Sequence, residues 1–402
     1  MHRFSSTVLC FITLSSSAIA ADWRQFRGTD TTGVAEIALS AEAVAGLDVA
    51  WTADLTGRGL SSPIIVGDKV FVTSSGGYRQ DRLHVTCFAA KDGKELWSRQ
   101  FRATGRTTSH PKTCVAAPTP ASDGERIFAL YSSDDLLCLD LDGNLLWTRA
   151  LIFDYPNASN SLGMASSPLL VAGTLVVPLE NDSQSVAVGI DPATGLTKWT
   201  IERPKRANWT SPAILPGKTP AEDLVLLQSS AGVAAVKPAT GETVWNFPNG
   251  ASTIQSSIVA NGTVYVPSKG ITALQIASGS ANPEVLWQVE RLAPNTASPI
   301  FYGDKLYVLN RANVLLCVDP KTGDIEWQQR TEGPFSATPV AAAGHLFFVN
   351  ETGLTQIVKL GGDKGEVVMT KDLGQTVLAT PSIAHNAVYI RSDGKLWKLA
   401  GK

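Results

Sequence analysis

A short basic and aromatic run interrupts the apolar pattern near the middle of the chain: Arg203-Pro204-Lys205-Arg206-Ala207-Asn208-Trp209. Its guanidinium and ammonium groups can pair with acidic partners, while the amide and the indole can hydrogen-bond and stack on a ligand. The alternative interpretation is a solvated basic turn in which Trp209 packs against an adjoining element. The run is therefore a candidate for a ligand or partner contact.

A second candidate is the long connection 102–117, in which cations and a histidine stand close together. Long connections between short strands commonly carry function. Another connection of this kind, 153–165, is rich in Asn, Ser and Gly. We predict that these connections form a binding face with the basic run. The side chains of this candidate binding face are Arg106, His110, Lys112, Arg203, Lys205, Arg206, Asn208 and Trp209.

Patterns of common catalytic and metal chemistry are absent from the sequence. It has no Gly-x-Ser-x-Gly elbow, no phosphate-binding glycine motif before a helix and no Cys-x-x-Cys pair. His84, His345 and His385 are scattered in or beside apolar strand patterns. Acidic-glycine turns such as Asp92-Gly93 lack the further ligands of a calcium loop and are typical of strand hairpins. We predict no catalytic residue and no metal site, and cofactor-binding residues stay unassigned.

Two short motifs recur along the chain. One is a Ser/Thr-Pro pair, and the other is an acidic-glycine turn followed by an apolar strand that carries Trp. The pairs are Ser62-Pro63, Thr119-Pro120, Ser167-Pro168, Ser211-Pro212, Ser298-Pro299, Thr338-Pro339 and Thr380-Pro381, with Ser256-Ser257 in the remaining position. The strand positions are Trp97, Trp147, Trp199, Trp245, Trp287 and Trp327, with Met369 in the next register.

These repeats have a period of about 40–45 residues with four short strands in each, which is typical of propeller blades. The eighth unit has only three strands after its Thr380-Pro381 pair. We predict that 49–55, which contains Trp51, supplies the missing strand, since an unclosed ring would expose strand edges. The expected fold is an all-β, eight-bladed β-propeller of four-stranded antiparallel blades. We expect each strand Trp to pack between neighbouring blades.

The Ser/Thr-Pro pairs should begin the innermost strands. Small residues one position ahead of each pair would then ring the central channel, because the blades converge there. These residues are Ser61, Pro118, Ser166, Thr210, Gln255, Ala297, Ala337 and Ala379. We also expect the segment 22–28, which is aromatic and basic, to pack across one face of the ring.

The composition and the N-terminal residues limit the possible fold class, binding partners and cellular location. Apolar residues make up 44% and charged residues 17%, with 34 Gly and 22 Pro, a balance that favours short strands and tight turns. The net charge of −2 gives no general attraction to nucleic acid or anionic lipid. Residues 1–20 have the pattern of a signal peptide with cleavage after Ala20, and Cys10 lacks a lipoprotein-type context. We expect one domain, 21–402, that is periplasmic or secreted, monomeric and without a membrane span.

Four cysteines follow the predicted signal peptide. Cys87, Cys138 and Cys317 occupy similar third-strand positions, where small apolar residues are expected. Cys114 lies in the connection 102–117. An oxidising compartment permits a bridge from Cys114 to Cys87 or to Cys138, and free buried thiols are the alternative.

The motif Leu-x-x-Asp-x-x-Thr-Gly-x-x-x-Trp, as at 316–327, resembles the repeat of the pyrroloquinoline quinone (PQQ) propeller family, and the segment 22–28 resembles the start of secreted members. The resemblance spans nearly the whole chain after the predicted signal. The family includes quinoprotein alcohol dehydrogenases and the outer-membrane assembly factor BamB, so the resemblance implies an eight-bladed propeller. The dehydrogenases hold PQQ with a vicinal disulfide and calcium, and no adjacent Cys pair and no Cys-x-x-Cys-His occurs here.

Three hypotheses follow for function. The first is an exported, non-catalytic binding or scaffold module with a protein partner in the cell envelope. The second is a PQQ-dependent oxidoreductase that uses PQQ with calcium. The third is a carbohydrate-binding module that uses Trp209 and the channel mouth.

Overall fold

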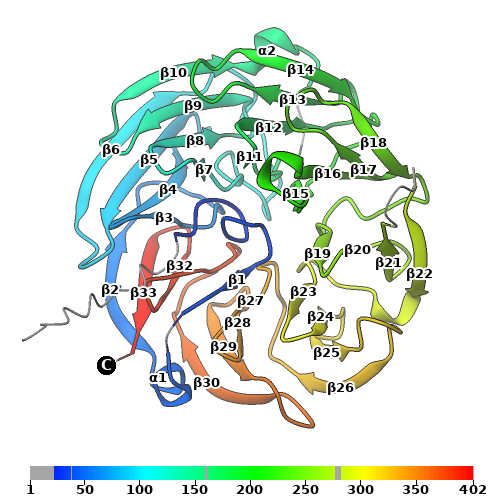
Figure 1. The fold of residues 1–402 in the computed structure, drawn as a ribbon. Coiled ribbons are helices and arrows are strands. Elements are labelled where there is room, and N and C mark those ends of the chain that lie inside the picture. The colour runs from blue at the N-terminus through cyan, green and yellow to red at the C-terminus, as the bar shows by residue number, and fades with distance from the viewer. Residues whose placement is uncertain (1–21, 38, 159–161, 277–281, 402) are drawn as a thin grey trace, which may run out of the picture.

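Eight sheets are arranged radially around one axis in the computed structural model, and seven of them have four strands while one has five (Figure 1). The structure describes residues 22–37, 39–158, 162–276 and 282–401. The predicted signal peptide and its cleavage site lie outside the described residues. The predicted eight-bladed all-β propeller is therefore confirmed.

Each blade runs from an inner strand at the axis to an outer strand at the rim. Blade 1 contains β3 (Ile64–Val66), β4 (Lys69–Gly76), β5 (Arg82–Ala89) and β6 (Glu95–Arg102), and blade 2 contains β7 (Ala121–Ser122), β8 (Arg126–Leu130), β9 (Asp135–Asp140) and β10 (Leu145–Ala150). Blade 3 contains β11 (Leu169–Val171), β12 (Thr174–Leu179), β13 (Val186–Ile190) and β14 (Thr197–Glu202), and blade 4 contains β15 (Ala213–Leu215), β16 (Leu224–Ser229), β17 (Gly232–Val236) and β18 (Thr243–Phe247).

The second half of the ring repeats this order. Blade 5 contains β19 (Ile258–Ala260), β20 (Thr263–Val266), β21 (Ile271–Gln275) and β22 (Glu284–Val289), and blade 6 contains β23 (Ile300–Tyr302), β24 (Lys305–Leu309), β25 (Val314–Val318) and β26 (Ile325–Arg330). Blade 7 contains β27 (Val340–Ala342), β28 (His345–Val349), β29 (Leu354–Lys359) and β30 (Glu366–Asp372), and blade 8 contains β31 (Ser382–Ala384), β32 (Ala387–Arg391) and β33 (Lys395–Ala400).

Short helices stand outside the sheets. They are α1 (Ala41–Ala45), α2 (Leu151–Asp154), η1 (Pro220–Glu222) and η2 (Glu290–Leu292). None of the helices in the described part of the chain has the length and hydropathy that a membrane crossing requires.

The last blade is completed by an N-terminal strand, as predicted. β2 (Asp48–Asp54) pairs antiparallel with β33, and Trp51 lies opposite Lys398 in the register. Lys395 Nζ also lies 2.8 Å from Asp54 Oδ1 across this pair. The two strands lie side by side in Figure 1, so the ring is closed by segments from opposite ends of the chain.

Strand Trp residues join the blades at the rim. The Nε1 atom of Trp97 donates to the carbonyl oxygen of Leu141 in blade 2 at 3.0 Å, and Trp147 Nε1 donates to Pro192 O in blade 3 at 3.1 Å. The acceptors belong to the acidic-glycine turns, which are hairpin turns as predicted. A side chain on Gly143 would come within 2.7 Å of the Trp97 ring, so this turn requires glycine for packing as well as for its positive φ of 83°. The predicted packing of Trp between blades is confirmed.

The segment 22–35 crosses one face of the ring, as expected for 22–28, and we call it the crossing segment. Its backbone and side chains bond to the inner strands of six blades. These bonds are Trp23 O with Ile65 N, Arg24 O with Ser122 N, Gln25 Oε1 with Leu170 N, Thr31 Oγ1 with Ile214 N, Arg27 Nη2 with Pro299 O, and Gly33 O with Ala341 N.

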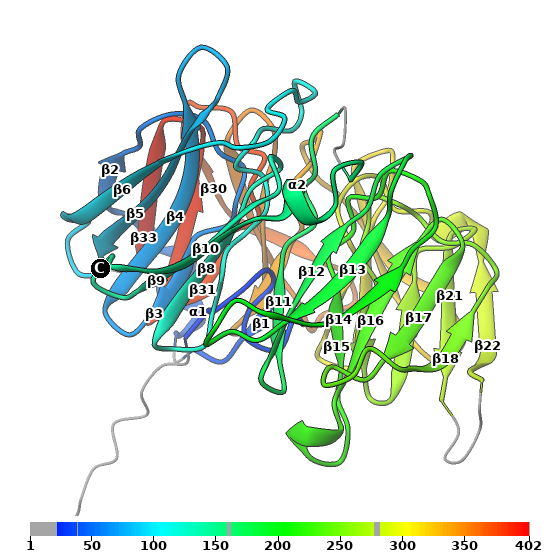
Figure 2. The same cartoon turned by 90° about the horizontal axis from the view of Figure 1, so that it is seen from above.

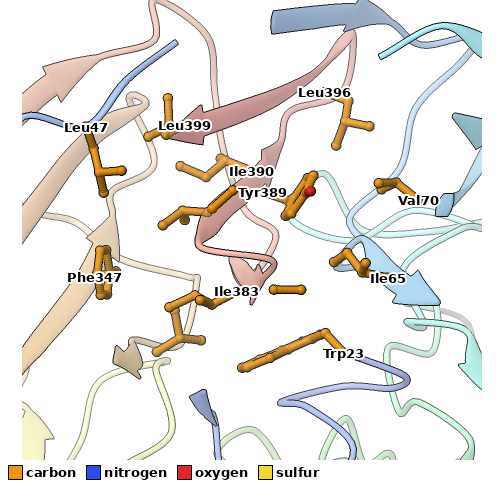
Figure 3. Packing of buried hydrophobic residues seen from close by; sticks show 14 of the residues in the cluster. Trp23, Leu47, Ile65, Val70, Phe347, Ile383, Tyr389, Ile390, Leu396 and Leu399 are labelled. Carbon is orange, nitrogen blue, oxygen red and sulfur yellow. The ribbon is translucent and has the colours of Figure 1, made fainter. Parts of the chain in front are cut away.

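The crossing segment also adds β1 (Val34–Ala35), which pairs parallel with β27 and was not predicted. Trp23 is buried in a cluster that includes Ile65 of blade 1 and Ile383 of blade 8 (Figure 3). The crossing segment therefore closes the channel at this face.

The cysteines of the strands and of the connection 102–117 are all buried. Cys87, Cys114, Cys138 and Cys317 are free, and burial raises the pKa of the Cys114 thiol to about 11. The structure therefore has the free-thiol alternative and not the Cys114 bridge.

We expect Gly143→Ala to destabilise the propeller more than Gly173→Ala. Both glycines have positive φ, 83° and 69°, so each alanine should cost about 1–2 kcal/mol of backbone strain. Only Gly143 faces an indole, and displacement of Trp97 should cost about 1–3 kcal/mol more. Urea unfolding of the two variants would measure the difference. Equal free energies of unfolding would contradict the packing role of the turn.

Candidate functional site

The inner ends of the eight blades present one hydroxyl side chain each to the central channel. They are the Ser/Thr residues of the repeated pairs, and all are buried. They are Ser62, Thr119, Ser167, Ser211, Ser256, Ser298, Thr338 and Thr380, which we call the hydroxyl ring.

Hydrogen bonds connect the hydroxyl ring from blade to blade. The backbone N–H of Ser62 donates to Thr119 Oγ1 at 2.9 Å, and the N–H of Thr119 donates to Ser167 Oγ at 3.0 Å. The pattern continues around the ring to Thr338 N, which donates to Thr380 Oγ1 at 3.0 Å. Seven of the eight junctions between blades have this bond.

The proline after each hydroxyl has a physical reason. A buried N–H without an acceptor costs free energy, and proline has no N–H to satisfy. Blade 5 has Ser257 instead of proline, and there the N–H and the hydroxyl of Ser257 both bond to Gln228 Oε1, at 2.8 and 2.6 Å. The one exception to the repeat is therefore compensated by a glutamine of blade 4.

The junction between blades 8 and 1 differs from the other seven. Here Ser62 Oγ is buried without a hydrogen-bond partner. Ser382 Oγ instead donates to Pro63 O at 2.6 Å, and Arg391 Nη1 donates to Thr73 O at 2.6 Å. Ser62 thus contributes a hydroxyl to the channel without supporting a junction.

The structure corrects the expected channel lining. Side chains alternate along a strand, so the pair residue faces the channel and the residue before it faces the blades. Ser61 Oγ donates to Thr73 O at 3.3 Å, Ser166 Oγ donates to Asn208 O at 3.2 Å, and Ala297 is buried in an apolar cluster. The prediction that these residues and their equivalents ring the channel was one position out of register. The channel is lined by the hydroxyl ring and by the residues two positions before it.

Those residues form a second, mostly apolar ring nearer the channel mouth: Leu60, Ala117, Ala165, Trp209, Ile254, Thr296, Ser336 and Leu378. Phe26 of the crossing segment lines the closed end. Together the two rings enclose a cavity of about 400 Å³, which we call the channel cavity.

The long connections meet above the channel cavity, and Figure 2 shows them on one face of the ring. The backbone N–H of His110 donates to Leu162 O at 2.8 Å, which joins 102–117 to 153–165. Trp209 Nε1 donates to Gly163 O at 2.7 Å. Lys112 Nζ lies 2.9 Å from Glu351 Oε1 of blade 7, so the first connection reaches across the mouth.

Members of the candidate binding face separate into three groups. His110, Lys112 and Trp209 line the channel cavity. Arg203 and Asn208 belong to a buried network instead, because Arg203 Nε and Asn208 Nδ2 each donate to the Glu180 carboxylate at 2.8 Å.

Burial raises the pKa of Glu180, and Arg203 opposes this shift. This network holds the basic run in place. The remaining members, Arg106, Lys205 and Arg206, are exposed.

Four residues that support this face were not predicted from the sequence: Glu180, Glu351, Asp134 and Asp135. Glu180 and Glu351 occupy strand turns, and no local pattern links them to cations far away in the chain. Asp134, in the turn between β8 and β9, and Asp135, the first residue of β9, are both buried. In the sequence, Asp134 and Asp135 directly follow the Ser132-Ser133 pair within an apolar stretch. This placement of two carboxylates was the signal from which their burial could have been predicted.

The two aspartates anchor the connections. Asp135 Oδ2 accepts from Thr104 N at 3.0 Å, and the carbonyl oxygen of Asp134 accepts from Leu151 N at 2.8 Å, where α2 begins. Burial, and secondarily the neighbouring Asp135, raises the pKa of the Asp134 carboxyl to about 8.

The lining was compared with what a calcium-bound quinone requires. Calcium takes several carboxylate or carbonyl oxygens, and a quinone with carboxylates requires cations. The channel cavity is lined by hydroxyls and aliphatic groups, with His110 and Lys112 as its only cationic or titratable side chains among the described residues. No group of three His, Cys, Asp or Glu residues in the described ranges could hold a metal ion. These residues do not fit PQQ with calcium.

The closed ring of eight blades and its repeats define a propeller repeat protein, and comparisons with known proteins give the family. A family model described as outer membrane protein assembly factor BamB matches residues 39–177, 82–285 and 269–357. The chain belongs to this PQQ-like repeat family.

Relatives in sequence have the same description. Outer membrane protein assembly factor BamB of Burkholderia pseudomallei (strain K96243) is 26% identical over 332 residues, which are 80% of this chain and 66% of that protein. BamB of Moranella endobia (strain PCIT) is 24% identical over 170 residues, 41% of this chain and 39% of that protein. The chain thus spans less than two thirds of the length of either relative.

Solved structures share the fold. BamB from Moraxella catarrhalis superposes with a TM-score of 0.64 at 15% identity, covering 89% of this chain and 98% of that one. Quinohemoprotein alcohol dehydrogenase from Comamonas testosteroni superposes with a TM-score of 0.72 at 14% identity, covering 96% of this chain and 82% of that one. At these identities the similarity shows the fold alone.

We expect Ser211→Ala to destabilise the protein while Ser62→Ala leaves its stability nearly unchanged. Ser211 Oγ accepts the buried N–H of Ser167 at 3.0 Å, and loss of this acceptor should cost about 1–3 kcal/mol. Ser62 Oγ accepts no such bond, so its removal should change the free energy of unfolding by less than about 0.5 kcal/mol. Urea unfolding would measure both, and equal losses would contradict the role assigned to the hydroxyl ring.

We expect Asp134→Asn to stabilise the protein at neutral pH and not at pH 4. The folded-state pKa of Asp134 is raised to about 8, so ionisation favours the unfolded state and stability falls as pH rises from about 4 to 8. Asparagine keeps the shape, carries no charge and tolerates the positive φ of 63°. Unfolding free energies measured across this range should diverge with rising pH, and parallel curves would contradict the burial effect.

Proposed function

We propose that this chain is an exported, non-catalytic scaffold that binds a protein partner in the cell envelope and acts in outer-membrane protein assembly. Membership of the family described as outer membrane protein assembly factor BamB supports this function. The observation that carries it is a rigid face with exposed aromatic and basic side chains around the channel mouth.

The aromatic part of this face is Tyr78 and Phe153. Tyr78 is 102% exposed in the loop between β4 and β5, which projects from the ring in Figure 2, and Phe153 in α2 is 78% exposed. Aromatic side chains in such positions are typical of protein interfaces. Both loops are held in place, because Gln80 Nε2 donates to Ser109 Oγ at 3.4 Å and Tyr155 Oη lies 2.8 Å from Thr200 Oγ1.

The basic part of this face is Arg106, Lys205 and Arg206, which are exposed. Several carboxylates near the connections are already paired: Glu180 with Arg203, Glu351 with Lys112 and Asp154 with Arg149. The exposed cations thus give the face a local positive potential, although the chain as a whole has a net charge of −2. The partner surface should therefore combine acidic side chains with apolar pockets for the two aromatic rings.

The connection between blades 3 and 4 offers a second contact. Arg203 and Lys205 line a hollow of about 410 Å³ together with Asn157 and Gln184. Its size and polar lining would accommodate a side chain or a turn of the partner. Because Arg203 is fixed by Glu180, this hollow is formed before the partner arrives.

We expect Lys205→Glu/Arg206→Glu to impair outer-membrane protein assembly. In the source organism without the native gene, the amount of folded outer-membrane protein should fall, and the wild-type chain should restore it. The double variant should restore less, because reversed charge repels an acidic partner. The matched control is Lys321→Glu/Lys364→Glu, two exposed lysines in turns at the opposite face, which should restore assembly fully.

Photo-crosslinking amino acids at Tyr78 and Phe153 would give a direct measurement. They should form a crosslink to an envelope protein, whereas the same group at Leu146, an exposed residue of an outer strand, should not. Full assembly without the gene, or equal restoration by both double variants, would contradict the proposed function.

A further inference from the structure

We propose that the channel cavity binds an uncharged polyol of about the size of a monosaccharide. This site is separate from the exposed side chains of the partner-binding face, and the proposal goes beyond the proposed function. It rests on three properties of the cavity wall: its hydroxyl donors, its lack of internal charge and its fixed indole.

The hydroxyl ring has unused hydrogen-bond donors. In seven of its members the oxygen accepts a backbone N–H from the neighbouring blade, and no member donates to an acceptor among the described residues. A hydroxyl has one donor and two acceptor positions, so each member keeps a proton and at least one lone pair for a ligand. Ser62 is 1% exposed, and its Oγ atom has no hydrogen-bond partner in the part of the chain that the structure describes.

Charge selects the class of ligand. Among the described residues, the wall of the channel cavity has no carboxylate and no arginine, and its only ammonium group, on Lys112 at the mouth, pairs with Glu351. An ionised ligand would lose its hydration without gaining a counter-charge, which is costly in a buried site. An entirely apolar ligand would cover the buried hydroxyls and leave them without partners. A neutral molecule with several hydroxyl groups satisfies both conditions.

Trp209 supplies the apolar part of the site. Its Nε1–H is fixed by Gly163 O at 2.7 Å, so its ring is held in the wall of the cavity. Leu60 and Leu378 stand in the same ring of residues. A pyranose has a polar rim and one face of C–H groups, and the C–H face matches a held indole while the rim matches the hydroxyl ring.

Size and access agree with a small ligand. A cavity of about 400 Å³ is at the lower end of the range for small-molecule sites. Phe26 closes the far end, so the ligand would enter from the mouth beside Lys112 and His110. Binding is non-covalent, and no chemical step is involved.

The test is titration of the purified mature chain with sugars, measured by calorimetry and by ligand-observed NMR. The neutral probes are D-glucose and D-galactose, and the charged probes of the same ring size are D-glucuronate and D-glucosamine. We expect at least one neutral sugar to bind with a Kd of about 1 mM or below, and each charged sugar to bind about tenfold more weakly.

Two variants separate the site from nonspecific binding. Trp209→Leu should weaken binding of the neutral sugar about tenfold through loss of the indole face. Ser62→Ala should weaken it about threefold or more while the unfolding curve stays unchanged, because this hydroxyl supports no junction. Lys205→Glu/Arg206→Glu should bind sugar as the wild type does, so a failure of the partner-binding face would leave this result intact.

Three outcomes would overturn the proposal. The first is that neither neutral sugar binds at a sugar concentration of about 10 mM, tenfold above the expected Kd. The second is that glucose and glucuronate bind with equal affinity. The third is that neither Trp209→Leu nor Ser62→Ala weakens the binding. The Ser62→Ala result stands even if Trp209→Leu disturbs the connections above the cavity.

Discussion

The rest of the structure depends on the hydrogen bond from the backbone N–H of one blade to the hydroxyl of the next. Eight sheets that converge on one axis leave space there for only a small side chain, and their first residues expose N–H groups that no strand partner satisfies. Serine and threonine meet both requirements, because they are small and they place an acceptor beside the backbone. The following proline removes the next N–H, and Ser257 with Gln228 shows what is needed where proline is absent.

A second contact ties the same blades at the rim. Indoles of the outer strands lie on glycine turns of the next blade, as Trp97 does on Gly143, Trp147 on Gly195 and Trp287 on Gly323. The hydroxyl contacts at the axis and the indole contacts at the rim together fix the angle between neighbouring sheets. Where the ring closes, β2 supplies the outer strand of blade 8 by pairing with β33. Because every blade is held at both ends, the connections above the mouth are free to differ in length and sequence. The long connections 102–117 and 153–165 and the basic run 203–209 are the places where the connections differ in this way.

Most of the fold could be predicted because its determinants are local and repeated. The eight blades, the closing strand and the packing of Trp follow from motifs that recur at nearly constant spacing. The channel lining was one position out of register, because small residues stand at both Ser61 and Ser62 and composition does not decide which one faces the axis. The segment 22–28 was expected to pack across one face of the ring, as it does, but β1 was not predicted, since a two-residue parallel pairing leaves no pattern.

The candidate site was less predictable, for a physical reason. His110, Lys112 and Trp209 were identified by residue type, and the structure does bring them to one cavity. Arg203 and Asn208 were chosen on the same grounds, yet they serve a buried carboxylate, Glu180, whose contact with them is set by the tertiary fold. A cation in a sequence is available to a partner only when no carboxylate of the same chain has already bound it.

The contacts that form the propeller leave the content of the channel open, so structural similarity to quinone enzymes shows the fold alone. The contacts that set the propeller use backbone groups, hydroxyls, glycines and indoles, and none of them specifies what the channel contains. The channel cavity of this chain is lined by hydroxyls, aliphatic groups and one fixed indole, and the lysine at its mouth is paired with Glu351. The lining favours neutral ligands, and the exposed charge lies on the outer connections where a protein can reach it.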